Sequence, residues 1–224
     1  MLQRFFTALI FTFMGAGFAS ADLLVTEIYP GVPGPDNTPE WFEIYNNGTT
    51  DMDISSLYFD DESADPTVND FINIVGGATT LGAGEYLIVF NDVSDGDAAG
   101  EIANFESFWG VGGFTYGRID NGAGLNDDGD AVFVFDGNTA GANVVASLDY
   151  SALSLSYQTA VLDLGTGQAV AATVGNLGAF SSAGTAGTDN LAVVGSPGAV
   201  NIPEPTSALI IAGGLLFAAT RRRK

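Results

Sequence analysis

Short apolar runs alternate with polar positions along the middle of the chain, and clusters of Gly, Asn and Asp separate the runs. Within EWFEIY, for example, Phe42 and Ile44 alternate with Glu43. Such a two-residue period places successive side chains on opposite faces of a strand, so one face of each strand is expected to build the core. Strands are predicted over LLVTEIY (23–29), EWFEIY (40–45), MDISSLYF (52–59), DFINIV (70–75), EYLIVF (85–90), GFTYGRI (113–119), AVFVFD (131–136), NVVASLDY (143–150), AVLDL (160–164), QAVAATV (168–174) and around 191–194.

No segment of residues 22–202 shows a sustained helical period of apolar residues. Many short strands between turn signals are typical of an antiparallel sandwich or barrel. The stretch 175–190 is rich in Gly, Ser, Thr and Ala, which favours a flexible connection before the last strand. The chain has no break that argues for two domains. The expected fold class is all-β, with one domain over residues 22–201.

The N-terminus has the composition of a signal peptide. Arg4 precedes the apolar run FFTALIFTFMGAGF, and small residues, Ala19 and Ala21, occupy the −3 and −1 positions of a cleavage site. Residues 1–21 are therefore predicted to form a signal helix that signal peptidase removes after Ala21.

The C-terminus, residues 202–224, has three parts in a fixed order. A Pro203-Glu204-Pro205 turn precedes an apolar run over 206–220, and a basic cluster ends the chain. As a helix the apolar run would measure about 22 Å, which is short of the roughly 30 Å hydrocarbon core. The basic cluster would keep its end of this short transmembrane helix in the cytoplasm. Its members are Arg221, Arg222, Arg223 and Lys224.

The order of these three parts resembles a PEP-CTERM sorting signal of Gram-negative bacteria. The resemblance implies recognition by an exosortase, a membrane-embedded cysteine transpeptidase that cuts near the motif. It also implies a transient stay in the inner membrane, followed by transfer to the cell surface or the extracellular matrix. Proteins of this kind often accompany exopolysaccharide and biofilm genes.

Charge and composition exclude several classes of function. Residues 22–202 carry Arg118 as the single basic side chain against 26 of the 27 acidic ones, a formal charge of −25. Such a body would repel nucleic acid, because binding to nucleic acid depends on cationic contacts to phosphate. The chain has neither His nor Cys. It therefore lacks the commonest general base, the thiolate nucleophile and the usual zinc ligands.

Five segments of the body resemble, in order, a lamin-tail domain of secreted bacterial proteins, from residue 24 to residue 201. Where relatives have Gly-Trp, this chain has Ser56-Leu57, so the core role of that Trp is expected to pass to Leu57, Tyr58 or Phe59. The resemblance implies an immunoglobulin-like antiparallel β-sandwich that serves as an interaction or tethering module. The five segments are LLVTEIYPG, EWFEIYNNGTTDMDIS, TLGAGEYLIVFND, GLNDDGDAVFVFD and GSPGAVN.

Glu27, Glu40 and Glu43 are the carboxylates of that family motif. Two of them could act as acid and base in glycoside hydrolysis, which needs two carboxyl groups about 5 to 10 Å apart in a cleft. The favoured interpretation is structural, because a sandwich has no built-in cleft. These side chains are then expected to point outward on adjacent strands or to bind loop backbone.

Two loop clusters could supply the oxygen ligands that Ca²⁺ prefers. Counted from Asp92, the Gly falls at position 5 instead of 6 and position 12 is not Glu, so the EF-hand spacing is absent. Solvated acidic turns are the simpler interpretation. Weak calcium binding stays open, because a divalent cation would relieve the self-repulsion of the body. The clusters are Asp92, Asp95 and Asp97, and Asp127, Asp128 and Asp130.

Aromatic side chains could form a sugar-stacking platform, although core packing is the favoured role. Among them Trp109 is expected to be the most exposed, because Gly residues surround it. Asn47-Gly48-Thr49 matches a glycosylation sequon, but it is expected to form the turn after the 40–45 strand. The aromatic candidates are Trp41, Tyr45, Phe108, Trp109 and Tyr116.

The sequence thus predicts an exported, exosortase-processed surface or matrix protein whose sandwich binds or tethers and is not an enzyme. It is expected to need no cofactor beyond possible weak calcium. Its expected partners are signal peptidase and exosortase during export, then exopolysaccharide or surface proteins. The alternatives are a calcium-dependent adhesin and a polysaccharide hydrolase that uses carboxylates alone.

Overall fold

A computed structural model describes residues 23–34, 38–93, 97–120 and 122–199, without the side chains of 92 and 93. The predicted signal peptide (1–21), the predicted sorting signal (202–224) and Asp95 lie outside the described residues.

Strands dominate the described chain, and each predicted run contains at least one of them. The sequence of elements includes one α-helix, α1 (Ala98–Trp109), and a short 3₁₀ turn, η1 (Val75–Gly77). The strands are β1 (Leu23–Tyr29), β2 (Trp41–Asn46), β3 (Met52–Asp53), β4 (Tyr58–Asp60), β5 (Asp70–Phe71), β6 (Asn73–Ile74), β7 (Thr80–Leu81), β8 (Tyr86–Val93), β9 (Thr115–Asp120), β10 (Ala131–Phe135), β11 (Val144–Asp149), β12 (Ala160–Asp163), β13 (Gln168–Ala171), β14 (Phe180–Ser181) and β15 (Val194–Gly195).

The strands form two main sheets that pack face to face. The larger sheet has the order β13-β12-β1-β2-β8-β9-β6, and the smaller has the order β11-β10-β4-β5. Two small pairs, β14-β15 and β3-β7, complete the structure. The structure is mostly β-sheet, as predicted, although the expected all-β class did not include α1. The expectation of purely antiparallel pairing is wrong for β8 and β9, which are parallel with α1 as the crossover between them. The isolated bridge between Gln158 and Val194 is also parallel.

The main core fills the space between the two sheets. Phe42 of β2 stacks on Phe59 of β4 with ring centroids 5.2 Å apart. Leu57 is also buried in this core, so Leu57 and Phe59 occupy the region expected to replace the Trp of relatives. Other contributors come from both sheets and include Val25, Ile28, Ile44, Leu87, Val89, Val132, Val134, Ala146 and Leu148.

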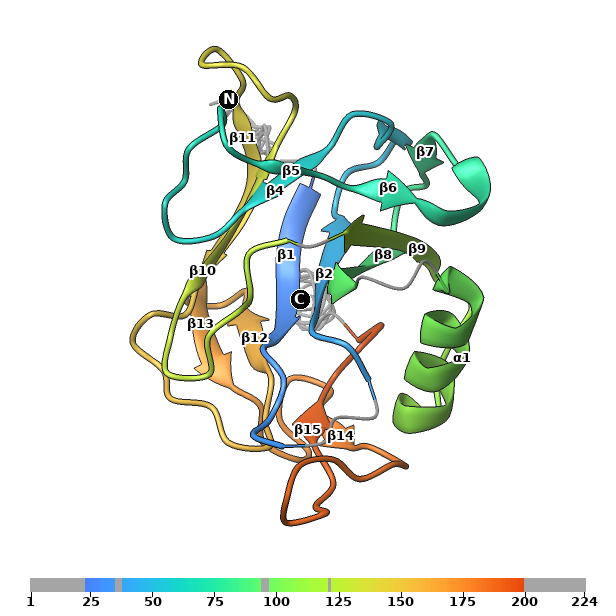
Figure 1. Cartoon of the computed structure of the whole chain (residues 1–224), viewed down its shortest axis with the longest axis vertical. Coiled ribbons are helices and arrows are strands. Elements are labelled where there is room, and N and C mark those ends of the chain that lie inside the picture. Colours follow the sequence, from blue (N-terminus) through green and yellow to red (C-terminus); the bar gives the residue numbers. More distant parts are fainter. Residues whose placement is uncertain (1–22, 35–37, 94–96, 121, 200–224) are drawn as a thin grey trace, which may run out of the picture.

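A second apolar layer covers the opposite face of the larger sheet. Trp41 and Phe90 of the sheet pack there against Phe105 of α1, and Val193, just before β15, joins them. Figure 1 shows α1 on one side of β1 and β2, with β10 and β11 on the other side. All six residues of β2 are therefore buried. The expectation that one face of each strand builds the core is wrong for this strand.

Helix α1 is the main element that the strand pattern does not predict. Asp97 caps its start, since the side chain accepts a hydrogen bond from the backbone N–H of Gly100 at 3.0 Å. Gly110 ends it in the left-handed conformation, with φ 73°. Phe105, Phe108 and Trp109 follow helical spacing and face the sheet.

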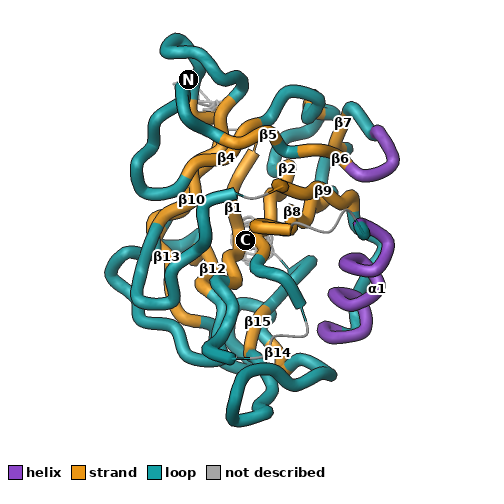
Figure 2. The backbone as a smooth tube through the Cα atoms, in the orientation of Figure 1, coloured by secondary structure: helices purple, strands orange, loops and turns teal. Residues whose placement is uncertain are grey.

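The stretch 175–190, expected to be a flexible connection, packs against the sandwich. β14 pairs with β15, and the Ser182 hydroxyl accepts a hydrogen bond from the backbone N–H of Val193 at 2.9 Å. Ala179 and Ala186 are buried. Figure 2 shows this region as long loops around β14 and β15. Within the described ranges, no helix is long and apolar enough to cross a membrane.

Candidate functional site: a buried glutamate pair

Glu27 on β1 and Glu43 on β2 occupy directly paired positions in the larger sheet. A bulge between Val25 and Glu27 precedes this pair. Each glutamate is 1% exposed. Alternation along the strands puts both on the sheet face that α1 and residues 193–198 cover. The expectation that these side chains point outward is therefore wrong.

Glu27 is held by groups from the end of the body. Its Oε1 accepts hydrogen bonds from the backbone N–H of Ser196 at 2.7 Å and from the Thr159 hydroxyl at 2.5 Å. Its Oε2 accepts the Ser196 hydroxyl at 3.1 Å. The carboxyl group thus joins β1 to a segment that lies 169 residues further along the chain.

Glu43 has a similar set of partners. Its Oε1 accepts the Thr26 hydroxyl at 2.6 Å, and its Oε2 accepts the backbone N–H of Gly198 at 2.6 Å. The two glutamates therefore bind the backbone of residues 195–198, which we call the closing segment. This segment belongs to GSPGAVN, the last of the five segments that carry the resemblance to lamin-tail domains. The alternative expectation, that these carboxylates bind loop backbone, describes the structure.

The closing segment comes so near the glutamates that a side chain is excluded at Gly195. A Cβ placed there would lie 2.7 Å from Glu27 Oε1 and 2.7 Å from the Trp109 ring. Gly198 has φ +78°, a conformation that residues with side chains rarely adopt. The two glycines thus allow the backbone N–H groups to reach the buried carboxyls.

Burial decides the protonation of the pair. Loss of water raises the pKa of both Glu27 and Glu43, and the charge of Glu43 raises the pKa of Glu27 further. The hydrogen bonds that they accept oppose this rise only in part. Folding therefore favours the neutral form of these two carboxyl groups.

Glu40, the third glutamate of the motif, also binds loop backbone. Its Oε2 accepts the backbone N–H of Leu125 at 2.8 Å and the Asn91 amide at 3.4 Å. It borders a surface depression of about 930 Å³ that is lined by residues 30–33, 38–40 and 124–127 and by Asn104 of α1. Glu27 and Glu43 do not line this depression. The three motif carboxylates thus do not converge on one cleft.

Three acidic residues of the two predicted calcium clusters, Asp97, Asp128 and Asp130, have local roles. Asp97 caps α1, and Asp128 accepts the Ser154 hydroxyl at 3.1 Å. Asp130 accepts the backbone N–H of Ala131 at 2.7 Å and that of Asn126 at 3.2 Å. Across the residues that the structure describes, no three acidic side chains are grouped as a metal site. Weak calcium binding at these loops stays a prediction.

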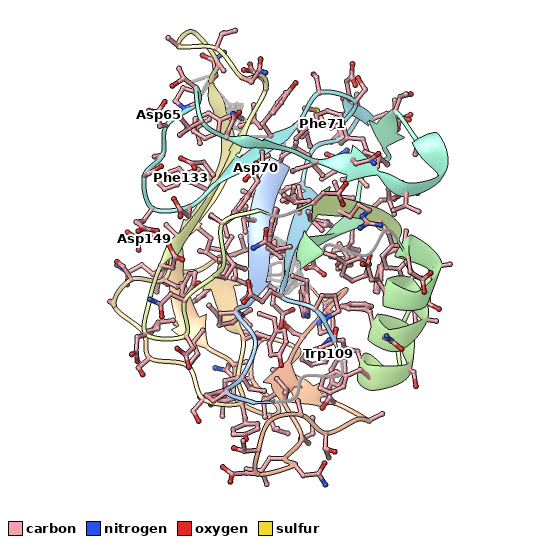
Figure 3. All side chains as sticks on the ribbon, in the orientation of Figure 1. Asp65, Asp70, Phe71, Trp109, Phe133 and Asp149 are labelled. Carbon is pink, nitrogen blue, oxygen red and sulfur yellow. The ribbon has the colours of Figure 1, made fainter. Side chains whose placement is uncertain are left out.

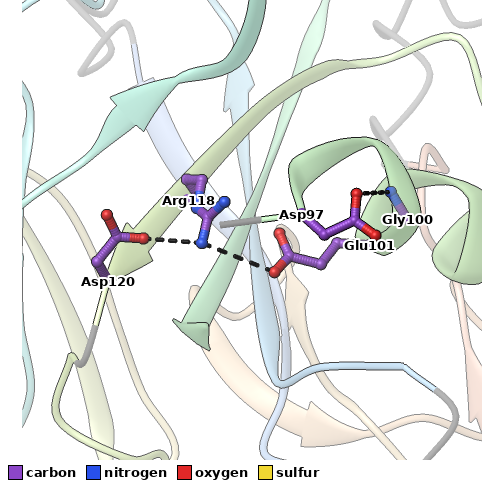
Figure 4. A network of polar contacts seen from close by, with 5 residues as sticks. All are labelled: Asp97, Gly100, Glu101, Arg118 and Asp120. Atoms are coloured by element: carbon purple, nitrogen blue, oxygen red, sulfur yellow. Dashed lines mark hydrogen bonds and ion pairs between the residues drawn. The ribbon is translucent and has the colours of Figure 1, made fainter. Parts of the chain in front are cut away.

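Arg118 on β9 joins the large sheet to the first turn of α1. Its Nη2 lies 2.9 Å from Asp120 Oδ1 and 3.8 Å from Glu101 Oε1 (Figure 4). Arg118 is 5% exposed and Glu101 is 9% exposed. The single basic side chain of residues 22–202 is thus committed to an internal ion pair.

The aromatic candidates lie in the core, as favoured. Trp109 was expected to be the most exposed of the five aromatic candidates, and this expectation is wrong. Its side chain is only 2% exposed. Its ring packs edge-on against Trp41, with centroids 5.6 Å apart. The glycines after Trp109 end a helix and do not open it to solvent.

The turn at Asn47 is confirmed, with the backbone N–H of Gly48 donating to the Asn46 side chain at 2.9 Å.

Comparison with known proteins agrees with this architecture. The family model of the lamin tail domain matches residues 17–152. No curated protein matches the chain, and no solved structure does. The partners of the buried glutamates, Thr159, Ser196 and Gly198, lie beyond the matched range. Ser196 and Gly198 belong to the GSPGAVN segment, whereas no sequence pattern indicates a role for Thr159.

Proposed function

Since this chain belongs to the lamin tail domain family, we propose that its sandwich is a non-catalytic binding or tethering module of an exported cell-surface or matrix protein. The family implies an immunoglobulin-like fold, and in this chain the helix α1 is added to it. The proposal includes export by a signal peptide, temporary anchoring in the inner membrane, and release by an exosortase.

The role of the glutamate pair supports a non-catalytic module. A glycoside hydrolase needs two carboxyl groups that reach the sugar from opposite sides. Glu27 and Glu43 have raised pKa values, as a catalytic acid would, but both are 1% exposed and hold the closing segment. Their perturbed pKa values follow from burial in a structural role, which can shift the pKa of a carboxyl group as catalysis does.

The charge distribution supports the proposed location. The acidic body, with a formal charge of −25, is separated in the sequence from the basic cluster 221–224. Basic residues next to an apolar run favour the cytoplasmic side of a membrane. Cleavage near Pro203-Glu204-Pro205 would leave the cluster in the membrane and release the acidic body.

Processing in the producing cell tests this proposal. Glu204→Gln and Pro205→Ala should each leave an uncut, membrane-held precursor, detected by its larger mass in the membrane fraction. Ser207→Ala, just after the motif, is the matched control and should be processed normally. Normal processing of both motif variants would count against sorting by an exosortase.

A further inference from the structure

The chain leaves the sandwich at Ala199, beside two loops that carry no charged side chain. The backbone N–H of Ala199 donates to Ser196 O at 2.8 Å, so a tight turn ends there. A Cβ placed at Gly178 would lie 2.9 Å from the Ala199 Cβ, and one placed at Gly198 would lie 2.7 Å from the Phe114 ring. We call the two loops, 110–114 and 173–179, together with residues 197–199, the exit surface.

The exit surface exposes an apolar side chain. Val174 is 59% exposed. It lies in a compact turn, since the backbone N–H of Asn176 donates to Thr173 O at 2.9 Å. Leu177 of the same loop and Phe114 of the other loop are half-buried. The exit surface therefore presents a defined apolar side chain close to the point where the chain leaves the sandwich.

Acidic residues are concentrated in other parts of the body. Of the 26 acidic residues in the body, 25 lie before residue 164, and Asp189 is the one charged residue between there and the sorting motif. Loop 110–114 has none either. Glu106, next to that loop, accepts the backbone N–H of Gly113 at 3.3 Å and the Tyr116 hydroxyl at 2.8 Å. The exit surface is thus an uncharged patch on a body with a formal charge of −25.

The acidic loop between β4 and β5 lies far from the exit surface. Figure 3 shows Asp65 and Asp70 towards one end of the long axis, and Trp109, whose ring borders the closing segment, towards the other. Figure 1 likewise separates β4 and β5 from β14 and β15. β14 begins directly after loop 173–179, and β15 leads into the closing segment. The two ends of the molecule therefore differ in charge.

The predicted membrane anchor follows the exit surface closely along the chain. Six residues, 200–205, separate Ala199 from the apolar run that begins at Thr206. An extended chain spans at most about 3.6 Å per residue, so Ala199 stays within about 25 Å of a membrane that holds this run. A folded body of this length is about 40 Å across. The short connection therefore turns the exit surface, and not the acidic β4–β5 loop, towards the membrane.

The chemistry of the exit surface suits a lipid bilayer. Anionic lipids repel acidic loops, whereas an uncharged loop with an exposed apolar side chain can enter the region between headgroups and acyl chains. A second copy of the body is a poorer occupant, because it would add another formal charge of −25 to the contact.

We propose that the exit surface docks on the lipid bilayer while the precursor is anchored, with Val174 inserted among the headgroups. Docking fixes the orientation of the body and holds the Pro203-Glu204-Pro205 motif at the membrane surface, where a membrane-embedded enzyme acts. This inference deepens the proposed function, because it rests on the temporary membrane anchor and names the surface of the body that meets the membrane.

Fluorescence quenching in vesicles tests the inference. The chain over residues 22–224 keeps the body and the apolar run without the predicted signal peptide, and it has no Cys, so a single labelled Cys can be introduced. Val174→Cys and Val68→Cys receive the same environment-sensitive probe. The vesicles contain phosphatidylethanolamine and phosphatidylglycerol, with or without a spin-labelled lipid as quencher.

Val68 is the matched control position, because it is 66% exposed and lies in the β4–β5 loop. The probe at position 174 should be quenched about fivefold more than the probe at position 68, since a body about 40 Å across keeps the β4–β5 loop away from the lipid. Equal quenching at the two positions would contradict docking through the exit surface.

A charged substitution tests the part played by Val174 itself. With the probe on Asn176→Cys in the same loop, Val174→Asp should reduce quenching about fivefold, because the burial of the Val side chain in the bilayer is lost. Val68→Asp is the control and should leave quenching at position 176 unchanged. Equal quenching with and without Val174→Asp would overturn the insertion of this side chain.

Two readouts keep this inference apart from the proposed anchor. Flotation of the chain with the vesicles reports the anchor, and quenching at position 174 reports docking. Flotation without quenching at position 174 would overturn docking and leave the anchor intact. Failure to float would overturn the anchor, and docking with it. Shielding of the probe at position 174 from aqueous iodide, without quenching by lipid, would identify a second copy of the chain as the occupant and overturn the inference.

Discussion

Glu27 and Glu43 face each other on neighbouring strands, and each accepts a backbone N–H from the closing segment, at 2.7 Å from Ser196 and 2.6 Å from Gly198. Buried carboxyl groups are costly unless they are hydrogen-bonded. The closing segment supplies these bonds from 155 and 169 residues away. The first two strands can therefore reach their final environment only when the end of the body is in place.

Removal of the closing segment should destabilise the body strongly. A chain over residues 22–194 keeps every strand of the two main sheets but leaves Glu27 and Glu43 without their backbone donors. Each buried acceptor left unsatisfied costs about 1–3 kcal/mol, against a total stability of about 5–15 kcal/mol for typical domains. Urea unfolding followed by circular dichroism measures the difference. The control, residues 22–199, should match residues 22–202. Equal stability of the chain that ends at 194 would contradict this role.

Loss of Arg118 should cost more than loss of a surface charge. Arg118→Met leaves Glu101 buried without its cation, for which about 3–5 kcal/mol is expected. Asp120→Asn should cost about 0–1 kcal/mol, because the Asp120 side chain is 59% exposed. Combining Arg118→Met with Glu101→Gln should recover part of the loss. Denaturant unfolding of the four proteins checks this, and equal costs for the two single changes would refute the buried pair.

The start of α1 should depend on the Asp97 cap. Asp97→Ala removes the acceptor of the Gly100 N–H and is expected to cost about 1 kcal/mol. Asp97→Asn retains a capping oxygen and should cost much less. Thermal unfolding of both variants separates these cases, and an equal loss in the two would argue against capping.

The strands could be predicted because alternation is a local property of the sequence. Helix α1 was missed because its first half, Ala98–Asn104, has one large apolar residue, Ile102, and its helical spacing begins only at Phe105. The position of Trp109 was misjudged for a related reason. The glycines that follow suggested exposure, whereas Gly110 ends the helix and leaves the indole between Tyr29 and Trp41.

The candidate site was predicted only in part. The motif pointed to Glu27, Glu40 and Glu43, and the expectation for all three was either outward orientation or binding to loop backbone, because a sandwich strand usually leaves one face to solvent. The second layer over the larger sheet reverses that expectation. The pairing of these glutamates with Ser196 and Gly198 joins distant parts of the chain, and no local pattern in a single sequence encodes such a contact.

The pH dependence of stability tests most directly whether Glu27 and Glu43 close the fold. Burial, with the charge of Glu43, raises the pKa of Glu27 from 4.5 to about 8. The folded body thus binds more protons than the unfolded chain between these values, so its stability should fall as the pH rises through them. A Gln side chain at position 27 can still accept the hydrogen bonds at Oε1, and its amide N–H can donate to the Ser196 hydroxyl. It carries no charge, so it does not titrate.

The deciding measurement is the free energy of unfolding of residues 22–202 at pH 5 and pH 8. The wild type should lose stability between the two, whereas Glu27→Gln combined with Glu43→Gln should lose less and should exceed the wild type at pH 8. Asp51→Asn, at an exposed position, should leave the wild-type fall unchanged. A double variant that is less stable at both pH values, with the full wild-type fall, would contradict the account.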